Sequence, residues 1–424
     1  MLIHVAVALV GLLAFAVLTI DYGVMWVSRR EAQNAADAAA LAGAYSLSLE
    51  APGDTSDTGR PKLSAHAVAM AHRVWGAAPS VNIPTDIIIA PCPDGVDTCV
   101  RVDVYRSTDR GNPLPTYFAQ ILGIGSQNVR ATATARVMNG NATNCLKPWA
   151  VADKWDEFDG AETDYDDPAY ALTGDPDFFS FTDSDGVPTS KATYDRFDNK
   201  NPENDLYVPP SNASCFGSMT CAGTGYHIYD TNGQTCCDYG KRLKLKNSQD
   251  QTQVSSGWFL ALRLLNSTGG ADYNWNIKNC NGTTVSIGDL LPLDTEPGNK
   301  VGPTRQGVDS DVDSLVNKDP SAYWSPNYFG AGKGAVISPT YGPNQSPRIV
   351  PVPVFDVHDY LATGPSGMST IQVRNILGFF VEGMCADDNK AVCGRLTSIP
   401  GDFVQGSSTV STPSSFLRKV VLIR

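Results

Sequence analysis

Residues 2–50 read LIHVAVALVGLLAFAVLTIDYGVMWVSRREAQNAADAAALAGAYSLSLE, and this stretch decides the fold of the N-terminal part of the chain. It has no charged residue before Asp21 and becomes rich in alanine after Arg30. Because the first proline is Pro52, we expect one unbroken helix from the N-terminus to about Glu50. At a rise of 1.5 Å per residue this helix is roughly 75 Å long, more than twice the hydrocarbon thickness of a bilayer.

Two simple interpretations of this segment leave part of it unexplained. A cleaved signal peptide has a basic start and a shorter apolar stretch, whereas this chain lacks the basic start and continues into good helix formers. A plain transmembrane anchor accounts for the apolar run but not for the alanine-rich continuation. Arg29 and Arg30 also lie on the side from which the large domain emerges, which is at odds with the positive-inside rule.

The segment resembles the N-terminal region of TadE/TadG-like proteins, which are pilin-related proteins of bacterial Tad (Flp-type) pilus systems. The resemblance is carried by residues 18–23 (LTIDYG), by the two arginines after them, and above all by residues 33–44 (QNAADAAALAGA). It implies insertion in the inner membrane before assembly, and the Tad-type secretion machinery as a partner. One feature differs: type IV-like pilins carry a docking Glu near the start of the helix, where this chain has His4 and Val5.

Small residues along the helix suit close packing of one helix against another in an apolar environment. Asp21, at the edge of the apolar run, is expected to reach water, to pair with an arginine, or, like His4, to find a partner on a neighbouring helix. The residues predicted to serve assembly are Gly11, Ala14, Asp21, Gly23, Arg29, Arg30, Ala36 and Ala40.

The bulk properties describe a folded, acidic, secreted type of protein. The length of 424 residues predicts two or three domains. The net charge is −12, and nucleic acid is excluded as a partner because the sequence holds no basic stripe. One short basic run, residues 241–246 (KRLKLK), is expected to be the solvated face of a strand.

All ten cysteines lie beyond the N-terminal helix, which predicts a disulfide framework formed in an oxidising compartment. Two local bridges are favoured because each pair flanks a short turn-rich stretch: Cys92 with Cys99, and Cys385 with Cys393. The other pairings stay open. A zinc site is the weaker alternative, since no CxxC pair is present. The sequence also has no CxxCH motif, which argues against covalently attached haem.

The predicted fold class is α+β, in three parts. Residues 1–51 form the pilin-like stalk helix, residues 52–140 a small α+β module, and residues 141–424 a mainly β, disulfide-rich ectodomain with long loops. In the module the pattern predicts helix 64–75, strands 86–90 and 99–105, a brief helix 115–122, and strand 129–137. In the ectodomain, β-like runs include 258–265, 335–337, 349–355, 371–381 and 417–423, with one helix at 301–315.

No catalytic motif is present in the sequence: it has no GxSxG elbow, P-loop, HExxH or nucleotide-binding GxGxxG. We therefore expect no enzymatic activity and no cofactor, with calcium as the single exception. Hard oxygen ligands in a turn-rich acidic segment suit calcium, although the EF-hand spacing is not met and solvated acidic loops are the favoured alternative. The candidate ligands are Asp164, Asp166, Asp183 and Asp185.

The sequence thus favours a structural subunit of an extracellular, pilus-like filament on the cell surface, which polymerises with copies of itself through the N-terminal helix and displays the ectodomain. The alternative is a monomeric, membrane-anchored pilus-assembly factor or surface adhesin. An extracellular hydrolase is a distant third hypothesis.

Overall fold

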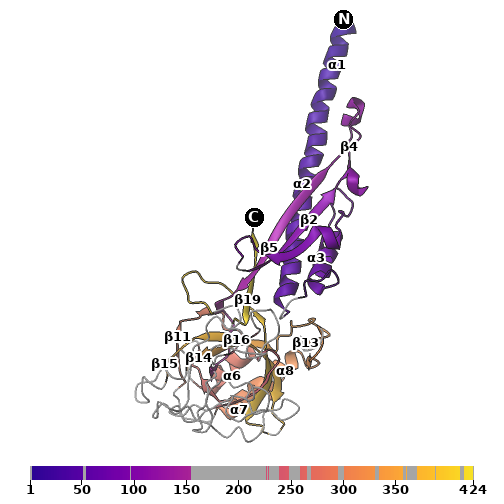
Figure 1. Ribbon diagram of the computed structural model, residues 1–424. Helices are drawn as coiled ribbons and strands as arrows, with labels where there is room; N and C mark the ends of the chain where they lie inside the picture. Colours follow the sequence, from indigo (N-terminus) through magenta and orange to yellow (C-terminus); the bar gives the residue numbers. More distant parts are fainter. Residues whose placement is uncertain are drawn as a thin grey trace. The chain divides into compact units, whose positions relative to one another are not determined.

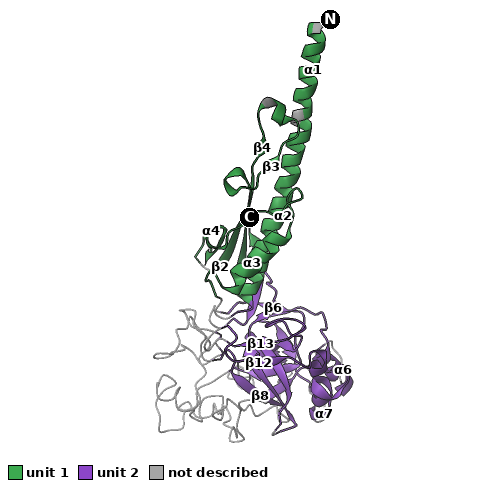
Figure 2. Cartoon of the chain, turned by 90° about the vertical axis from the view of Figure 1, so that its right-hand side faces the viewer, with its two compact units in different colours: residues 1–48, 53–138, 420–424 green, residues 49–52, 139–419 purple. Residues whose placement is uncertain are grey.

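The computed structural model divides the chain into two compact units, shown in two colours in Figure 2. Unit 1 holds residues 1–48, 53–138 and 420–424, and unit 2 holds residues 49–52 and 139–419. The expected stalk and α+β module therefore belong to one unit, to which the end of the chain also returns. The structure describes residues 2–50, 54–95, 97–153, 226, 228, 238–247, 258–264, 269–294, 300–329, 334–356, 360, 370–386, 388–410 and 415–423.

Unit 1 is organised around the long N-terminal helix, seen in Figure 1 as the indigo rod. It comprises α1 (Leu2–Ala16), a π-helical turn η1 (Val17–Asp21) and α2 (Tyr22–Ser48). The Thr19 hydroxyl donates to the Phe15 carbonyl oxygen at 2.9 Å, a back-bond of the kind that accompanies bent or widened helix turns. The helix is continuous as predicted, with one wider turn where the apolar run ends.

A twisted antiparallel sheet packs against α2 in unit 1. Strand β2 lies between β1 and β5, so that Val102 is opposite Ile87 on one side and Ala133 on the other. The order helix, strand, strand, short helix, strand agrees with the prediction, although the short helix is 3-10 rather than α. The elements are α3 (Arg60–Ala71), α4 (Ile83–Asp86), β1 (Ile87–Pro91), β2 (Thr98–Arg106), η2 (Thr108–Arg110), β3 (Leu114–Pro115), η3 (Ala119–Leu122), β4 (Ser126–Gln127) and β5 (Val129–Asn139).

Helix α2 carries small side chains where it meets the sheet and α3, and these let the backbones approach closely. Ala36, Ala40 and Ala44 are fully buried along one face, at the four-residue spacing of a helix stripe. A Cβ placed on Gly43 would meet Val100 Cγ1 at 2.9 Å and Ala65 Cβ at 3.1 Å, so the contact admits no larger residue without a shift. The alanine-rich half of the helix is thus the core face of unit 1.

A second strand pair in unit 1 carries the turn that matters for the functional site. Strands β3 and β4 pair through Leu114 opposite Gln127 and Pro115 opposite Ser126, with η3 between them. In both Figure 1 and Figure 2 this turn rises beside the long helix toward the N-terminus of the chain.

Unit 2 is built on a closed six-stranded barrel whose strand order is β14-β16-β17-β8-β9-β7. Most neighbours are antiparallel, while β7 with β14 and β8 with β9 are parallel. Large side chains such as Trp149, Phe259 and Phe379 fill its core, and the mainly β prediction is confirmed. The barrel strands are β7 (Trp149–Ala152), β8 (Arg242–Asn247), β9 (Trp258–Ala261), β14 (Ile349–Phe355), β16 (Asn375–Met384) and β17 (Ala391–Thr397).

The basic run at 241–246 lies in β8 and alternates as expected of a half-solvated strand. Leu243 and Leu245 are buried, whereas Arg242 and Lys246 pair with Glu382 and Asp388. These cations serve ion pairs within the unit, which agrees with the absence of a basic surface stripe in the sequence.

Short elements surround the barrel, and one of them differs from the prediction. Residues 301–315 do not form one helix: α7 passes into a π turn that ends at Ser310, and a separate short helix begins at Leu315. Helix α6 was not predicted at all. These elements are β6 (Ala142–Thr143), α6 (Gly270–Lys278), β10 (Val285–Ser286), β11 (Leu290–Pro292), α7 (Val301–Arg305), η4 (Gln306–Ser310), α8 (Leu315–Lys318), β12 (Tyr323–Ser325), β13 (Ala335–Ile337) and β15 (Thr370–Gln372). The last two strands, β18 (Ile399–Pro400) and β19 (Leu417–Ile423), extend the sheet of β1, β2 and β5 instead.

Candidate functional site: the N-terminal helix and its junction with unit 1

The first half of the N-terminal helix is apolar and exposed on every face. Its large side chains project outward, and Leu12 is 71% exposed. Within the described residues, one helix, Ile3–Ser48, is long and apolar enough to cross a membrane. An apolar surface of this length is stable only inside a bilayer or against other apolar helices.

The small residues of the exposed half leave room for close approach by another helix. Ala14 is exposed, and a Cβ added to Gly11 would meet no described atom within 4 Å. A Cβ added to Gly23, the second residue of α2, would likewise meet no described atom within 4 Å. These three predicted assembly residues therefore lie on open helix surface.

Two other predicted assembly residues lie elsewhere than expected. Ala36 and Ala40 are fully buried against the sheet and α3 of their own unit. Their small size serves close packing, as the sequence indicated, but the packing is within unit 1 rather than between copies of the chain. The helix surface open to a partner is accordingly concentrated in the apolar half.

Asp21 ties the helix to the turn between β3 and β4. Its carboxylate accepts hydrogen bonds from the backbone N–H groups of Tyr117 at 2.7 Å, Phe118 at 3.0 Å and Ala119 at 2.5 Å. The side chain of Gln127 donates to the Asp21 carbonyl oxygen at 3.3 Å. Asp21 is only 3% exposed, so a buried charge is compensated by donors at the N-terminus of η3.

This arrangement corrects the expected role of Asp21. The sequence suggested water, an arginine or a neighbouring helix as its partner, whereas the structure supplies the donors from a segment almost one hundred residues away in the same unit. Sequence reasoning missed that segment. The only available signal was that a carboxylate next to an apolar run needs hydrogen-bond donors.

Arg29 and Arg30 follow on the helix, beyond the junction. The Arg30 guanidinium lies over the Trp26 ring, 5.1 Å from its centroid. Arg29 lines an open cleft of about 420 Å³ together with Arg130 and Asp109. Both arginines thus stand where the apolar segment gives way to the polar surface of unit 1.

Disulfide bonds join both local cysteine pairs that the sequence favoured. Cys92 is bonded to Cys99 and Cys385 to Cys393, seven and eight residues apart. A third bond joins Cys145 to Cys280 across 135 residues, a pairing that no local pattern could indicate.

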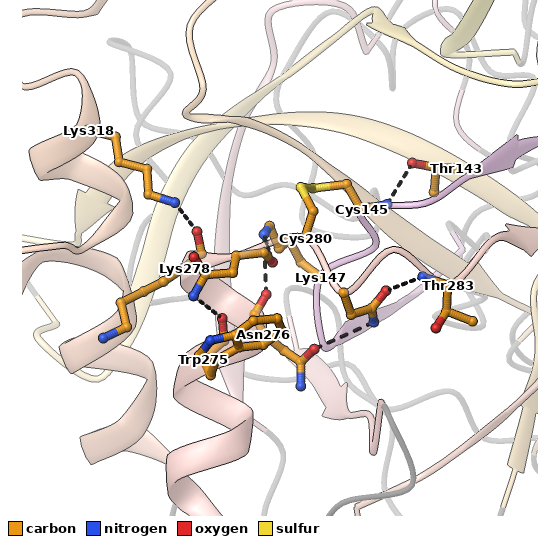
Figure 3. The surroundings of a disulfide bond; sticks show 11 residues. Thr143, Cys145, Lys147, Trp275, Asn276, Lys278, Cys280, Thr283 and Lys318 are labelled. Atoms are coloured by element: carbon orange, nitrogen blue, oxygen red, sulfur yellow. Dashed lines mark hydrogen bonds between the residues drawn. A yellow bond between two sulfur atoms is a disulfide. The ribbon is translucent and has the colours of Figure 1, made fainter.

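Beside this long-range disulfide lies a buried lysine (Figure 3). Lys147 Nζ donates to the carbonyl oxygens of Asn276 at 3.2 Å and Asn279 at 2.8 Å, and so satisfies carbonyls at the C-terminus of α6. Burial, with the positive charge of Lys318 as a smaller cause, lowers the pKa of Lys147 from 10.5 to about 7.

The predicted calcium ligands Asp164, Asp166, Asp183 and Asp185 lie outside the described residues, so calcium stays a prediction. In the part of the chain that the structure describes, no group of three or more His, Cys, Asp or Glu side chains is arranged to hold a metal ion.

Comparison with known proteins assigns the N-terminal segment. Residues 3–46 match the family described as "Putative Flp pilus-assembly TadE/G-like". The matched range covers η1 and nearly all of α1 and α2, and the resemblance seen in the sequence is confirmed over it. No curated protein and no solved structure matches the chain.

The match at residues 3–46 supports a pilus-related role, in connection with the Tad pilus system. This family is of a structural or assembly type rather than an enzymatic one. Together with the exposed apolar helix, it indicates a membrane-anchored or cell-surface location.

Proposed function

We propose that this protein is a structural subunit of an extracellular Tad-type pilus filament. Residues 2–20 hold it in the inner membrane before assembly and then pack against the same segment of other copies. The large unit 2 is displayed on the outside. The TadE/G-like match at residues 3–46 and the exposed apolar helix support this proposal.

The observation that carries the proposal is the division of one continuous helix into two halves. The second half is part of the core of unit 1, whereas the first half projects from it with apolar side chains on all faces. Where the two halves meet, the Asp21 carboxylate binds the backbone amides of the turn between β3 and β4. A subunit built this way presents its apolar rod in a fixed direction, which a regular helical array requires.

Small residues in the projecting half support packing between copies. In an apolar environment, helices associate through close van der Waals contact, which Gly and Ala permit. Gly11 and Ala14 are three residues apart and open to a partner. They provide the point of closest approach in the proposed filament core.

A second candidate function is a monomeric, membrane-anchored assembly factor or adhesin. The feature that favours it is the engagement of Asp21, Ala36 and Ala40 within unit 1, which leaves fewer polar and small residues for contacts between copies. The replacement of the docking Glu of type IV-like pilins by His4 and Val5 points the same way.

Substitution of Gly11 separates the two candidates. Gly11→Leu adds bulk at the proposed contact, and Ala6→Leu makes a similar change about 140° around the helix, since each residue turns the helix by about 100°. Ala6 is also exposed. Both variants keep the segment apolar, so both are expected to insert in the membrane.

The measurement is the amount of the protein in filaments sheared from cells, relative to the amount in the membrane fraction. We expect Gly11→Leu to deplete the sheared fraction while Ala6→Leu leaves it unchanged. Equal recovery of both variants and the natural chain in sheared filaments would remove Gly11 from the contact. Absence of all three from that fraction would favour the anchored factor.

A further inference from the structure

We propose that residues 116–125, here named the interfacial turn, enter the lipid headgroup region of the membrane that residues 2–20 cross. The protein then has two membrane contacts, the helix and this turn. The proposal goes beyond the filament function, because it concerns the membrane-inserted chain and holds for a subunit or an anchored factor alike.

The position of the turn follows from its hydrogen bonds to Asp21. That residue is the first one after the apolar run, and it binds the amides of Tyr117, Phe118 and Ala119. From this attachment the turn extends beside the helix toward the N-terminus, as both views of unit 1 show (Figures 1 and 2). If residues 2–20, about 29 Å of helix, span the hydrocarbon core, the turn reaches the boundary of that core.

Three large side chains of the turn are exposed to solvent, while Thr116 and Ala119 are buried in unit 1 and Gln120 is polar. Ile121 is 64% exposed, Ile124 51% and Tyr117 51%. Three large apolar groups exposed within eight residues form a patch, rather than the scattered single residues usual on a soluble surface. At a lipid interface the same groups are removed from water.

Several backbone groups of the turn are hydrogen-bonded within unit 1, which favours entry into an apolar boundary. Besides the three amides held by Asp21, the N–H of Ile121 donates to the Phe118 carbonyl at 3.1 Å and the N–H of Ile124 to the Ala119 carbonyl at 3.0 Å. The Thr116 hydroxyl donates to the Ile124 carbonyl at 2.6 Å.

Aromatic and basic residues surround the turn in the order that a membrane interface favours. Tyr22 and Trp26 are exposed on the helix just beyond the apolar run, and Trp75 packs edge-on against Tyr117. Arg29 and Arg30 follow, where they can reach lipid phosphates. Tyr and Trp are enriched at the headgroup level, with Arg on the aqueous side.

The bilayer is the occupant that these observations favour over a second copy of the chain. The turn lies beside the long helix in both ribbon views, and both carry exposed apolar side chains, so that a membrane which covers one also covers the other. Lipid covers exposed apolar side chains without a matching surface, whereas a protein partner must supply one.

The test uses the full-length protein reconstituted at one copy per lipid nanodisc. A small environment-sensitive fluorescent amino acid replaces Ile121 in one variant and Ile88 in another. Ile88 is the control, because it is an exposed apolar residue of the same unit, on strand β1 and remote from the junction. Lipids with bromine near the headgroup end of the acyl chain serve as the quencher.

We expect the probe at position 121 to lose about half or more of its fluorescence in brominated nanodiscs, as a group buried 5–10 Å into the interface would. The probe at position 88 is expected to keep its fluorescence. An unquenched probe at position 121 in single-copy nanodiscs overturns the proposal. The proposal is also overturned if the probe becomes shielded only at high protein density, because that result would assign the patch to a contact with another copy.

A second variant tests the role of Asp21 in holding the turn. Asp21→Asn, combined with the probe at position 121, is expected to reduce the quenching, because the carboxylate charge that binds three amides is lost. Hydrogen exchange of β2 amides reports whether unit 1 stays folded. Unchanged quenching in a folded variant would show that the turn is not positioned through Asp21, and would overturn that part of the proposal.

Discussion

Asp21 marks the point where the apolar half of the N-terminal helix meets the folded part of unit 1. A carboxylate at this position costs free energy unless donors surround it, and three backbone amides of the turn supply them. One residue therefore fixes both the end of the apolar run and the position of a distant segment.

Gly43 gives a direct test of the close contact between α2 and its neighbours. Gly43→Val is expected to destabilise unit 1 by about 1–3 kcal/mol, because its side chain meets Val100 and Ala65. Gly23→Val is the matched control, since a Cβ there meets no described atom within 4 Å. The measurement is the free energy of opening from hydrogen exchange of β2 amides, and equal values for the two variants would contradict the packing described.

The lowered pKa of Lys147 predicts that the stability of unit 2 depends on pH. Its pKa is lowered to about 7 by burial, against 10.5 in the unfolded chain, so between these values the unfolded state holds a proton that the folded state has released. The unfolding free energy then rises with pH by up to about 1.4 kcal/mol per unit above pH 7, and this slope vanishes below it.

Lys147→Met isolates this effect, because it keeps the length of the side chain without the amine. Denaturant unfolding followed from pH 6 to pH 9 is expected to show a positive slope for the natural chain that exceeds the slope of the variant above pH 7. The same slope in both proteins would show that Lys147 stays protonated in the folded state.

At the scale of elements, local patterns predicted well where the determinants are local. Strands 335–337, 349–355 and 417–423 have the predicted bounds, because β-branched runs between turn residues are sufficient to define them. The prediction of one helix at residues 301–315 is wrong because of tertiary contacts. Gly307 lies against Ile277, and Asp311 binds Lys278 and Asn274, so contacts with α6 divide the expected helix.

In the candidate site, too, some features could be predicted from the sequence and others could not. The apolar run and its small residues are visible in the sequence, as is the similarity of residues 33–44 to the pilus-assembly family. The burial of Ala36 and Ala40 within unit 1 cannot be seen in the sequence, because alanine suits an intramolecular contact and a contact between copies equally well. The partner of Asp21 is a turn whose amides carry no sequence signature.

The disulfides of unit 2 differ in how much of the chain they enclose. In the chain-entropy estimate, the bond Cys145–Cys280 stabilises the fold by about 5 kcal/mol, and Cys385–Cys393 by about 2.5 kcal/mol, because the closed loops are 135 and eight residues long. The replacement of both cysteines of a pair by alanine is expected to lower the denaturation midpoint more for the long-range pair. The reverse order would mean that native contacts around α6 outweigh loop closure.

At the scale of the whole molecule, the chain leaves unit 1 after residue 138 and returns to it at residue 420. Strand β19 lies next to β5 in the sheet order, although almost three hundred residues separate them in the sequence. Unit 2 is thus an insertion between two neighbouring strands, a pairing that sequence patterns alone do not reveal. The N-terminal helix and the end of the chain consequently belong to the same unit.

The central claim is that residues 2–20 join copies of this chain into a filament. Electron cryomicroscopy of material sheared from cells that express the chain tests it most directly. The account predicts filaments with one 45.3 kDa chain per repeat, whose core consists of the N-terminal helices packed at Gly11 and Ala14. Filaments that lack the protein, together with its recovery as a detergent-soluble monomer, would contradict the claim.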